Sequence, residues 1–378
     1  MNHEQSQRPD VAILVSFSGE GGVERMVLNL VNALAEEGSH IDLLLIKSDS
    51  RHLDRIHPSV KRIDLGAGHT ATSLPSLVRY LRKVHPPCLL AAKDRAGRLA
   101  VVARALAGAA GTRLALRLGT NLTAALAHKS LWRRVLRRLP IRLLYPRIET
   151  IIAVSEGVRQ DTLAVSGVDP RRVVVVRNPV ITRTLLEAST APSPHPWLSQ
   201  AGTPVVLGAG RLTLQKDFPT LLRAFAKLRE KRPCRLIILG EGRQRQALLE
   251  LGRELGISKD LALPGFTPNP HAYMGRADLF VLSSRWEGSP NVLTEAMALG
   301  TPVVATDCPS GPAELLEQGH IAPLVPVGEW RALAEAMASV LDHPPQGEQL
   351  RRAVREYSAE TSARRYREIL GLTHATID

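Results

Sequence analysis

Apolar residues recur along the chain in two alternating patterns, short continuous runs and longer stretches with helical spacing. The first short run, Val11–Phe17, is followed by a helical stretch and then by a second run, Ile41–Ile46. The same order returns later, where Val205–Gly208 precedes a helical stretch and the run Arg235–Leu239. Short apolar runs that alternate with helices predict βαβ units and parallel sheets.

The helical stretch after the first run has a regular apolar face. Its members are Val23, Met26, Val27, Leu30, Val31 and Leu34. These positions repeat with the three- and four-residue spacing of an amphipathic helix, and Gly38 is suited to end it.

The length of 378 residues favours two domains, since single cores seldom grow beyond about 250–300 residues. We expect an N-terminal domain at 1–186, a Pro- and Ser-rich linker at 187–202 and a second domain at 203–345. A C-terminal helical segment, 346–378, is expected to pack back on the first domain. The predicted class is α/β, with two Rossmann-like domains facing each other across a cleft and ligands beyond the carboxyl ends of the strands.

Composition is that of a globular protein, with 44% hydrophobic and 22% charged residues. No apolar run approaches the roughly 18–20 residues that span a bilayer, and the polar start MNHEQSQRPD predicts no signal peptide. Cys88, Cys234 and Cys308 fit no zinc spacing, so we expect buried free thiols in a reducing, cytoplasmic compartment.

The net charge of +13 is carried by the first half of the chain. Residues 1–185 hold 28 Lys and Arg against 15 Asp and Glu, whereas residues 186–378 hold 21 of each kind. Between Asp94 and Glu149 there are 12 basic residues and no acidic one. This asymmetry indicates that only the first domain meets an anionic partner.

Two carboxylates, Glu287 and Glu295, lie eight positions apart across a predicted loop-to-helix junction. We expect Ser289 to cap that helix, Pro290 to occupy its first turn and Gly300 to end it. The mouth of a helix offers backbone N–H groups to a phosphate, while flanking carboxylates suit hydroxyl groups such as those of a sugar or a ribose.

Two further loops follow predicted strands. The loop Gly19–Gly22 could let a phosphate or a sugar approach bare backbone, but glycine turns also serve strand–helix packing. In the second loop, Arg211 and Lys216 could clamp a diphosphate, or could be ordinary surface charges, and Asp217 could cap the next helix. Neither loop completes the G-x-G-x-x-G fingerprint, which disfavours a nicotinamide-dependent dehydrogenase.

Nearly the whole chain resembles the retaining glycosyltransferases of family four, which have the GT-B fold. The matching segments include GAGRLTLQKDFPTLLRAF, WEGSPNVLTEAMALGTPVVATDCPSGPAELL and GEGGVERMVLNLVNALAEEG. The sequences of these segments most resemble those of enzymes that build lipopolysaccharide core, capsule and related surface glycans.

The resemblance implies a role for each matching residue. Arg211 and Lys216 would neutralise the donor diphosphate, Glu287 would contact hydroxyls of the donor sugar, and Glu295 would bind the ribose. The diphosphate would meet backbone groups at the following positions: Asn291, Val292 and Leu293, and from the other domain Gly21 and Gly22. No metal is required, and no DxD-type motif is present.

The first domain departs from the family pattern, in which many relatives place a histidine or an acid after the strand that matches Arg113–Leu118. Here the segment continues with Gly119, Thr120 and Asn121, so no base or nucleophile is assigned. Asn121 could position the sugar or the acceptor. Arg117 could meet an anionic acceptor, although a surface arginine is the more common fate.

The segment Lys129–Leu139 has an amphipathic pattern. One helical face carries Leu131, Trp132, Val135, Leu136 and Leu139, and the other carries Lys129, Arg133, Arg134, Arg137 and Arg138. A helix on an anionic membrane surface has this pattern, and so does a helix packed on a sheet with a solvated basic face. Nucleic acid is a poorer partner, since aromatic residues make up 4% and no recognition module is visible.

The sequence therefore predicts an enzyme that moves a hexosyl or N-acetylhexosaminyl group from a nucleotide-sugar to a glycan or lipid-linked acceptor, with retention, at the inner face of the membrane. Alternatives are a nucleotide-sugar epimerase or sugar-phosphate synthase of the same fold, and a non-catalytic relative that acts as a partner protein.

Overall fold

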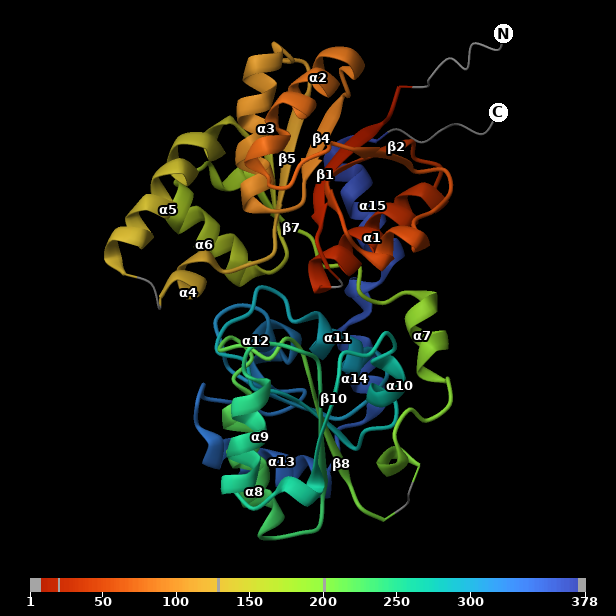
Figure 1. Cartoon of the computed structure of the whole chain (residues 1–378), viewed down its shortest axis with the longest axis vertical. Coiled ribbons are helices and arrows are strands. Elements are labelled where there is room, and N and C mark those ends of the chain that lie inside the picture. Colours follow the sequence, from red (N-terminus) through yellow and green to blue (C-terminus); the bar gives the residue numbers. More distant parts are fainter. Residues whose placement is uncertain (1–7, 20, 128–129, 200–201, 373–378) are drawn as a thin grey trace. The chain divides into compact units, whose positions relative to one another are not determined.

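The computed structural model describes residues 8–19, 21–127, 130–199 and 202–372. Contacts divide the chain into two compact units, Met1–Pro179 with Ala359–Asp378, and Val180–Ser358 (Figure 1). The first boundary falls before residues 187–202, so the segment expected to be a linker belongs to the second unit. At the second boundary the chain returns to the first unit.

The first unit is built on a seven-stranded sheet of order β3-β2-β1-β4-β5-β6-β7, in which the pairings are parallel. Its strands are β1 (Val11–Phe17), β2 (Ile41–Ser48), β3 (Lys61–Asp64), β4 (Cys88–Ala91), β5 (Arg113–Leu118), β6 (Thr150–Ala153) and β7 (Val173–Val175). Its described helices are α1 (Gly22–Glu36), α2 (Leu74–Val84), α3 (Asp94–Ala107), α4 (Leu122–Leu126), α5 (Leu131–Leu144), α6 (Glu156–Ser166) and α15 (Ala359–Leu370). The predicted first strand and the amphipathic helix after it are confirmed.

Both faces of this sheet are covered. Ala12 and Leu14 lie in one apolar cluster, and Ile13 of the same strand lies in the other, together with Met26 of α1 and Tyr366 of α15. Because successive side chains of a strand point to opposite faces, a strand covered on both sides reads as a continuous apolar run.

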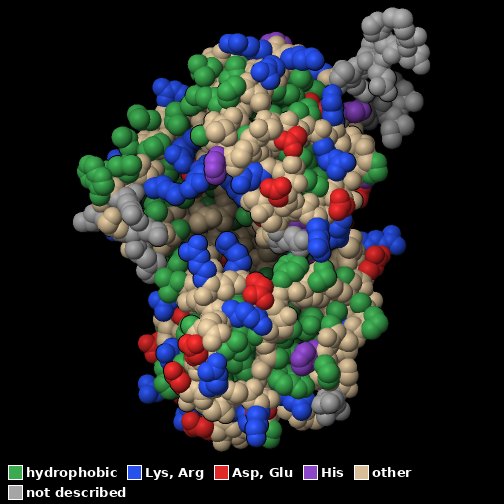
Figure 2. Space-filling model, in the orientation of Figure 1, with side chains coloured by type: hydrophobic (Ala, Val, Ile, Leu, Met, Phe, Trp, Pro, Cys, Tyr) green, Lys and Arg blue, Asp and Glu red, His purple; other side chains and the backbone are tan. Residues whose placement is uncertain are grey.

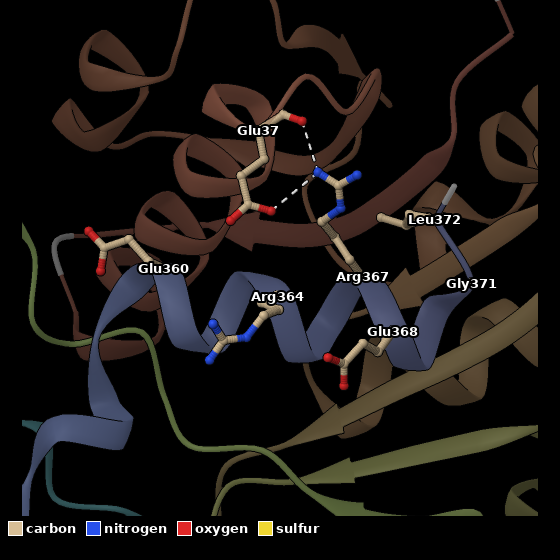
Figure 3. Close-up of a pocket in the computed structure, with 7 residues that line it drawn as sticks. All are labelled: Glu37, Glu360, Arg364, Arg367, Glu368, Gly371 and Leu372. Atoms are coloured by element: carbon tan, nitrogen blue, oxygen red, sulfur yellow. Dashed lines mark hydrogen bonds and ion pairs between the residues drawn. The ribbon is translucent and has the colours of Figure 1, made fainter. Parts of the chain in front are cut away.

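The C-terminal helix α15 packs beside α1 and is fastened to the first unit by polar contacts. Arg367 donates to the carbonyl oxygen of Glu37 at 2.8 Å and pairs with the Glu37 carboxylate at 3.2 Å (Figure 3). These residues line a hollow of about 790 Å³, in which both signs of charge are present. The paired charges hold the helix in place and leave little net charge for a ligand.

The second unit is built on a six-stranded parallel sheet of order β10-β9-β8-β11-β12-β13. Its strands are β8 (Val205–Ala209), β9 (Arg235–Leu239), β10 (Leu261–Gly265), β11 (Leu279–Leu282), β12 (Val303–Thr306) and β13 (Leu324–Val325). Its described helices are α7 (Arg183–Ser189), α8 (Phe218–Arg229), α9 (Arg245–Glu254), α10 (His271–Met274), α11 (Asn291–Ala298), α12 (Pro312–Leu315), α13 (Trp330–Asp342) and α14 (Gly347–Ala353).

The N-terminal part of the segment 187–202, near residues 188–191, is held against the second unit by its own backbone carbonyls. Asn269 donates to Ala188 at 2.9 Å, and Arg276 donates to Ser189 at 2.9 Å. Trp197 packs against the core of the unit. The Pro- and Ser-rich composition predicted a linker. Contacts made through backbone carbonyls do not depend on side-chain type, so the sequence pattern could not reveal them.

Helix α5 keeps much of its apolar face in solvent. The exposed side chains are Trp132 (73%), Val135 (59%), Leu136 (60%), Leu139 (59%) and Leu143 (56%). The helix is anchored at its other end by Ile141, which is buried in the core. This arrangement contradicts a helix whose apolar face packs on the sheet; Lys129 lies outside the described residues. In the described parts of both units, the helices are too short or too polar to cross a bilayer.

Candidate active site

The strand order of the second sheet reverses between β8 and β11. In open parallel sheets, ligands bind beyond the carboxyl ends of the strands at such a reversal. The loop after β8 carries Arg211 and Lys216, the loop after β11 carries Glu287, and α11 carries Glu295. The fold thus brings four residues that the sequence singled out to one edge of one sheet.

Hydrogen bonds to backbone carbonyls join these two loops. The backbone N–H of Arg285 donates to the carbonyl of Gln215 at 2.8 Å. The side-chain amide of Gln215 donates to the carbonyl of Trp286 at 3.0 Å. The Ser283 hydroxyl donates to the carbonyl of Lys216 at 2.8 Å. Side chains on the two loops are therefore held at a fixed separation.

Lys216 and Glu287 form an ion pair across these loops. Lys216 Nζ lies 2.6 Å from Glu287 Oε1, and the Ser284 hydroxyl donates to the same oxygen at 2.7 Å. The two charged side chains are only 15% and 8% exposed. A carboxylate so deeply buried needs a cation and hydrogen-bond donors, and this one has both. Glu287 is therefore not a solvated surface charge.

Gly210 makes room for the Lys216 side chain. A Cβ at this position would lie 2.9 Å from Lys216 Cε, and the backbone φ of +150° disfavours other residues. The aliphatic part of Lys216 therefore crosses bare backbone on its way to Glu287.

Asp217 occupies the N-cap position of α8, as expected, but its side chain does not cap the helix. Its carboxylate instead accepts from the Thr220 hydroxyl at 2.9 Å and pairs with Arg285 at 3.0 Å. The pair adds a further link between the two loops.

The mouth of α11 differs from the prediction by one residue. The helix begins at Asn291 with Pro290 in the N-cap position, and no side chain caps it. Ser289 is thus no cap, because a proline follows it and displaces the helix start. The N–H of Leu293 already donates to the Pro290 carbonyl at 3.0 Å, which removes it from the expected phosphate donors. The first-turn amides ahead of it, including that of Val292, remain the candidates.

Glu295 is buried, with 3% of the residue exposed, and lies inside the unit rather than on a solvated helix surface. Its Oε2 atom is 3.5 Å from His271 Nε2, and His271 is itself 9% exposed. The sequence pattern did not predict this pair.

Arg211 is exposed, at the start of the same loop. The backbone beside it is packed closely against the β9–α9 loop, since a Cβ on Gly240 would lie 2.0 Å from the Gly210 carbonyl oxygen. Arg211 therefore lies on a supported loop with its guanidinium open to solvent, available to an anionic ligand.

In the first unit, Gly21 is the N-cap of α1 and Gly22 is its first residue. Glu24 in the first turn is buried and pairs with Lys93 at 3.0 Å. Lys93 follows β4, so this pair lies at the strand reversal of the first sheet. Glu20 lies outside the described residues.

The two residues considered for the acceptor have structural contacts in the first unit. Arg117 is 3% exposed, donates to Asn178 Oδ1 at 2.6 Å, and hydrogen-bonds Tyr366. Its guanidinium is enclosed in the core, contrary to the expectation that it could meet an acceptor. Asn121 caps α4 by accepting from the Ala124 N–H at 2.9 Å. Asn121 stands directly before a short helix, and asparagine is a preferred residue at the N-cap position.

The three cysteines are buried and free, as expected. Burial raises the pKa of the Cys308 thiol, and the neighbouring Glu287 carboxylate raises it further. The pKa values of Cys88 and Cys234 are raised by burial to about 11. Neutral thiols of this kind are packing groups. Among the described residues, no cluster of three His, Cys, Asp or Glu side chains could hold a metal ion.

Two parallel-sheet units, with cations, carboxylates and a helix mouth gathered at a strand reversal, define the GT-B class of glycosyltransferases. Residues 193–360 match the family model for group 1 glycosyl transferases, and residues 20–184 match that for glycosyltransferase family 4. The two matches together cover most of the chain, which belongs to the group 1, family 4 glycosyltransferases.

Two relatives illustrate the range of the family. One is the N-acetylgalactosamine-N,N'-diacetylbacillosaminyl-diphospho-undecaprenol 4-alpha-N-acetylgalactosaminyltransferase of Campylobacter jejuni, 29% identical over 64% of this chain and 62% of that protein. The match therefore spans less than two thirds of that relative's length. The other is the lipopolysaccharide core biosynthesis glycosyltransferase LpsE of Rhizobium meliloti, 28% identical over 86% of this chain and 87% of that protein.

Among solved structures, Anabaena Alr3699/HepE in complex with UDP-glucose matches with a TM-score of 0.79. The match covers 96% of this chain and 99% of that one at 21% identity. At this identity the likeness establishes the shared fold.

Proposed function

We propose that the protein is a retaining glycosyltransferase that moves a hexosyl or N-acetylhexosaminyl group from a nucleotide-sugar to a glycan or lipid-linked acceptor of surface polysaccharide biosynthesis. The observation that carries this proposal is the Lys216–Glu287 pair beside the α11 mouth, with Glu295 buried in the same helix. A leaving diphosphate develops negative charge, which preorganised cations and N–H donors stabilise.

Each group has a place in this reaction. Lys216, Arg211 and the first-turn amides of α11 neutralise the diphosphate, Glu287 orients the transferred sugar, and Glu295 accepts from the ribose hydroxyls. Since protein cations supply the positive charge, we expect transfer to persist in the presence of a chelator.

The choice of donor and acceptor is supported by the relatives. A uridine nucleotide is named for the Anabaena structure, and a diphospho-undecaprenol acceptor for the Campylobacter enzyme. Screening UDP-, GDP- and dTDP-sugars by thermal unfolding tests the donor, because a ligand at a hundred times its dissociation constant adds about 2.7 kcal/mol.

Transfer itself is tested with an undecaprenyl-diphosphate-linked saccharide and the donor that stabilises the protein. We expect an α-linked product from an α-linked donor, determined by the anomeric proton coupling in NMR. A β-linked product contradicts retention. Conversion of the donor to an isomeric nucleotide-sugar without an acceptor identifies an epimerase instead, and transfer to a sugar phosphate identifies a synthase.

We propose further that α5 binds an anionic membrane surface, where a lipid-linked acceptor is found. Figure 2 shows apolar side chains gathered over α5, with basic side chains beside them. Trp132, Leu136 and Leu139 are exposed on this helix, and Arg134, Arg137 and Arg138 follow the same turns. Apolar side chains inserted at the lipid boundary beside arginines at the headgroups match this pattern.

Cosedimentation with vesicles of phosphatidylglycerol and phosphatidylethanolamine tests this surface. Changing both Trp132 and Leu136 to Ser should release the protein from these vesicles, with the unfolding temperature unchanged. Leu186→Ser, at an exposed leucine of α7, is the matched control and should remain bound. Equal binding by the α5 variant contradicts the assignment.

A further inference from the structure

We propose that His271 is a positioning residue for nucleotide binding: its Nε2–H holds Glu295 Oε2, so that the rest of the carboxylate faces the ribose. The inference rests on the proposed function, because it assigns Glu295 to the ribose. It adds a residue that neither the sequence pattern nor the family resemblance singled out.

The first observation is an unusual buried contact. His271 Nε2 is buried, and within the described residues it has no hydrogen-bond partner. The nearest charged atom recorded for it is Glu295 Oε2 at 3.5 Å. A buried polar atom left unbonded costs about 1–3 kcal/mol, so its persistence requires an explanation.

The distance indicates a bond that is almost formed. An N–H···O hydrogen bond spans about 2.7–3.2 Å, so closure at 3.5 Å requires a shift of only a few tenths of an ångström. Hydrogen bonds at binding sites are often long without ligand and shorten in the complex. We infer that ribose binding closes the contact.

The histidine is held by its own local structure. It is the first residue of α10, and the preceding Asn269 fixes that turn by accepting from the Ala272 N–H at 3.2 Å. Asn269 also donates to Ala188 at 2.9 Å, which ties the turn to the 187–202 segment. A ring on so short a helix is therefore placed by packing and can orient a neighbouring carboxylate.

The carboxylate has enough acceptor sites for both partners. An ionised Glu side chain has about four lone-pair positions, of which His271 would occupy one. Fixing Oε2 leaves Oε1 with one orientation, which suits the two adjacent hydroxyls of a ribose. Without the histidine, the Glu295 carboxylate would lose the contact proposed for its Oε2 atom.

Isothermal titration with UDP and with 2′,3′-dideoxy-UDP tests the role. Wild-type protein should bind UDP about tenfold more tightly than the dideoxy nucleotide, the effect of hydrogen bonds to a charged group. His271→Leu should weaken UDP binding about tenfold, leave dideoxy-UDP binding unchanged, and so abolish the discrimination. His271→Gln, which keeps a side-chain N–H, should retain most of it.

The outcomes separate a positioning role from a structural one. Equal discrimination in wild type and His271→Leu overturns the inference but not the donor site. So does an equal loss of affinity for both nucleotides, which is what a general packing defect would cause. Failure of the wild-type protein to bind any of UDP, GDP and dTDP overturns the proposed donor site and this inference together.

Discussion

At the scale of single residues, the central feature is a buried ion pair that joins two loops. Lys216 and Glu287 are far apart in sequence, yet their charged atoms lie 2.6 Å apart, supported by Ser284. The lysine compensates the buried carboxylate in the free protein, and in the proposed reaction it would also face phosphate charge.

Removing the lysine should affect both stability and turnover. Lys216→Ala leaves Glu287 buried with only hydroxyl support, and we expect a loss of about 3 kcal/mol, the lower end for a broken buried pair. Adding Glu287→Gln should restore most of this stability, while turnover stays low in both variants. Urea unfolding and transfer assays measure the two effects. A Lys216→Ala protein as stable as wild type contradicts the pair.

Gly210→Ala should disturb the same lysine from the backbone side. The new methyl group meets Lys216 Cε at 2.9 Å, so the flexible side chain must move and its amine leaves Glu287. We expect turnover to fall about tenfold or more, equivalent to about 1.4 kcal/mol. Gly256→Ala is the control, because that residue also has positive φ (+69°) but open space around it. Equal kinetics in the two variants would refute the contact.

The sequence singled out residues that the fold brings together, but it did not predict the contacts among them. Glu287, Glu295 and Lys216 were identified because each stands beside a predicted strand end or helix mouth. The partnership of Lys216 with Glu287 could not be predicted, because it depends on which strands are neighbours. The contact of His271 with Glu295 could not be predicted either. It joins the helices α10 and α11, and the sequence pattern does not show that these two helices are neighbours.

At the scale of elements, the strands and long helices were the best-predicted features. The runs Val11–Phe17 and Arg235–Leu239 are strands with those bounds, because parallel strands buried on both faces are continuously apolar. The α11 start was misplaced by one residue, since Pro290 takes the N-cap position in place of Ser289. The 187–202 segment was misassigned because its anchors are backbone carbonyls.

Helix α15 provides a pH-dependent test of the first unit. Burial raises the pKa of Tyr366 to about 12, despite the opposing effect of Arg117. An unfolded tyrosine ionises near pH 10, so between about pH 10 and 12 the folded state binds more protons and stability falls as pH rises. The slope from one such group is at most about 1.4 kcal/mol per pH unit.

Tyr366→Phe should remove that contribution. Urea unfolding between about pH 9 and 11.5 should show a shallower loss of stability in the variant, although it is less stable at neutral pH for lack of the Arg117 hydrogen bond. Identical slopes would show that Tyr366 does not remain protonated in the folded protein.

At the scale of the whole molecule, charge and exposed apolar surface separate the two units. The excess of basic residues belongs to the first half of the chain, and α5 within it exposes its apolar side chains. The second half is neutral and carries the candidate donor site. The division suits a protein that uses one unit for a membrane-bound acceptor and the other for a nucleotide.

Binding to anionic vesicles should therefore depend on salt. Arginines near headgroups contribute about 1 kcal/mol each, and this attraction falls off within a Debye length of about 10 Å at 0.1 M salt and 3 Å at 1 M. We expect cosedimentation to weaken steeply between these concentrations, and to be weak with phosphatidylcholine at any salt. Salt-independent binding would mean that charge does not contribute.

The most direct test of the account is a crystal structure with UDP bound. We predict the diphosphate at the mouth of α11, within hydrogen-bond distance of Lys216 and the Val292 amide, and the ribose hydroxyls on Glu295 with His271 Nε2 closed to about 3 Å. A nucleotide bound elsewhere, or a ribose that does not touch Glu295, would contradict the account.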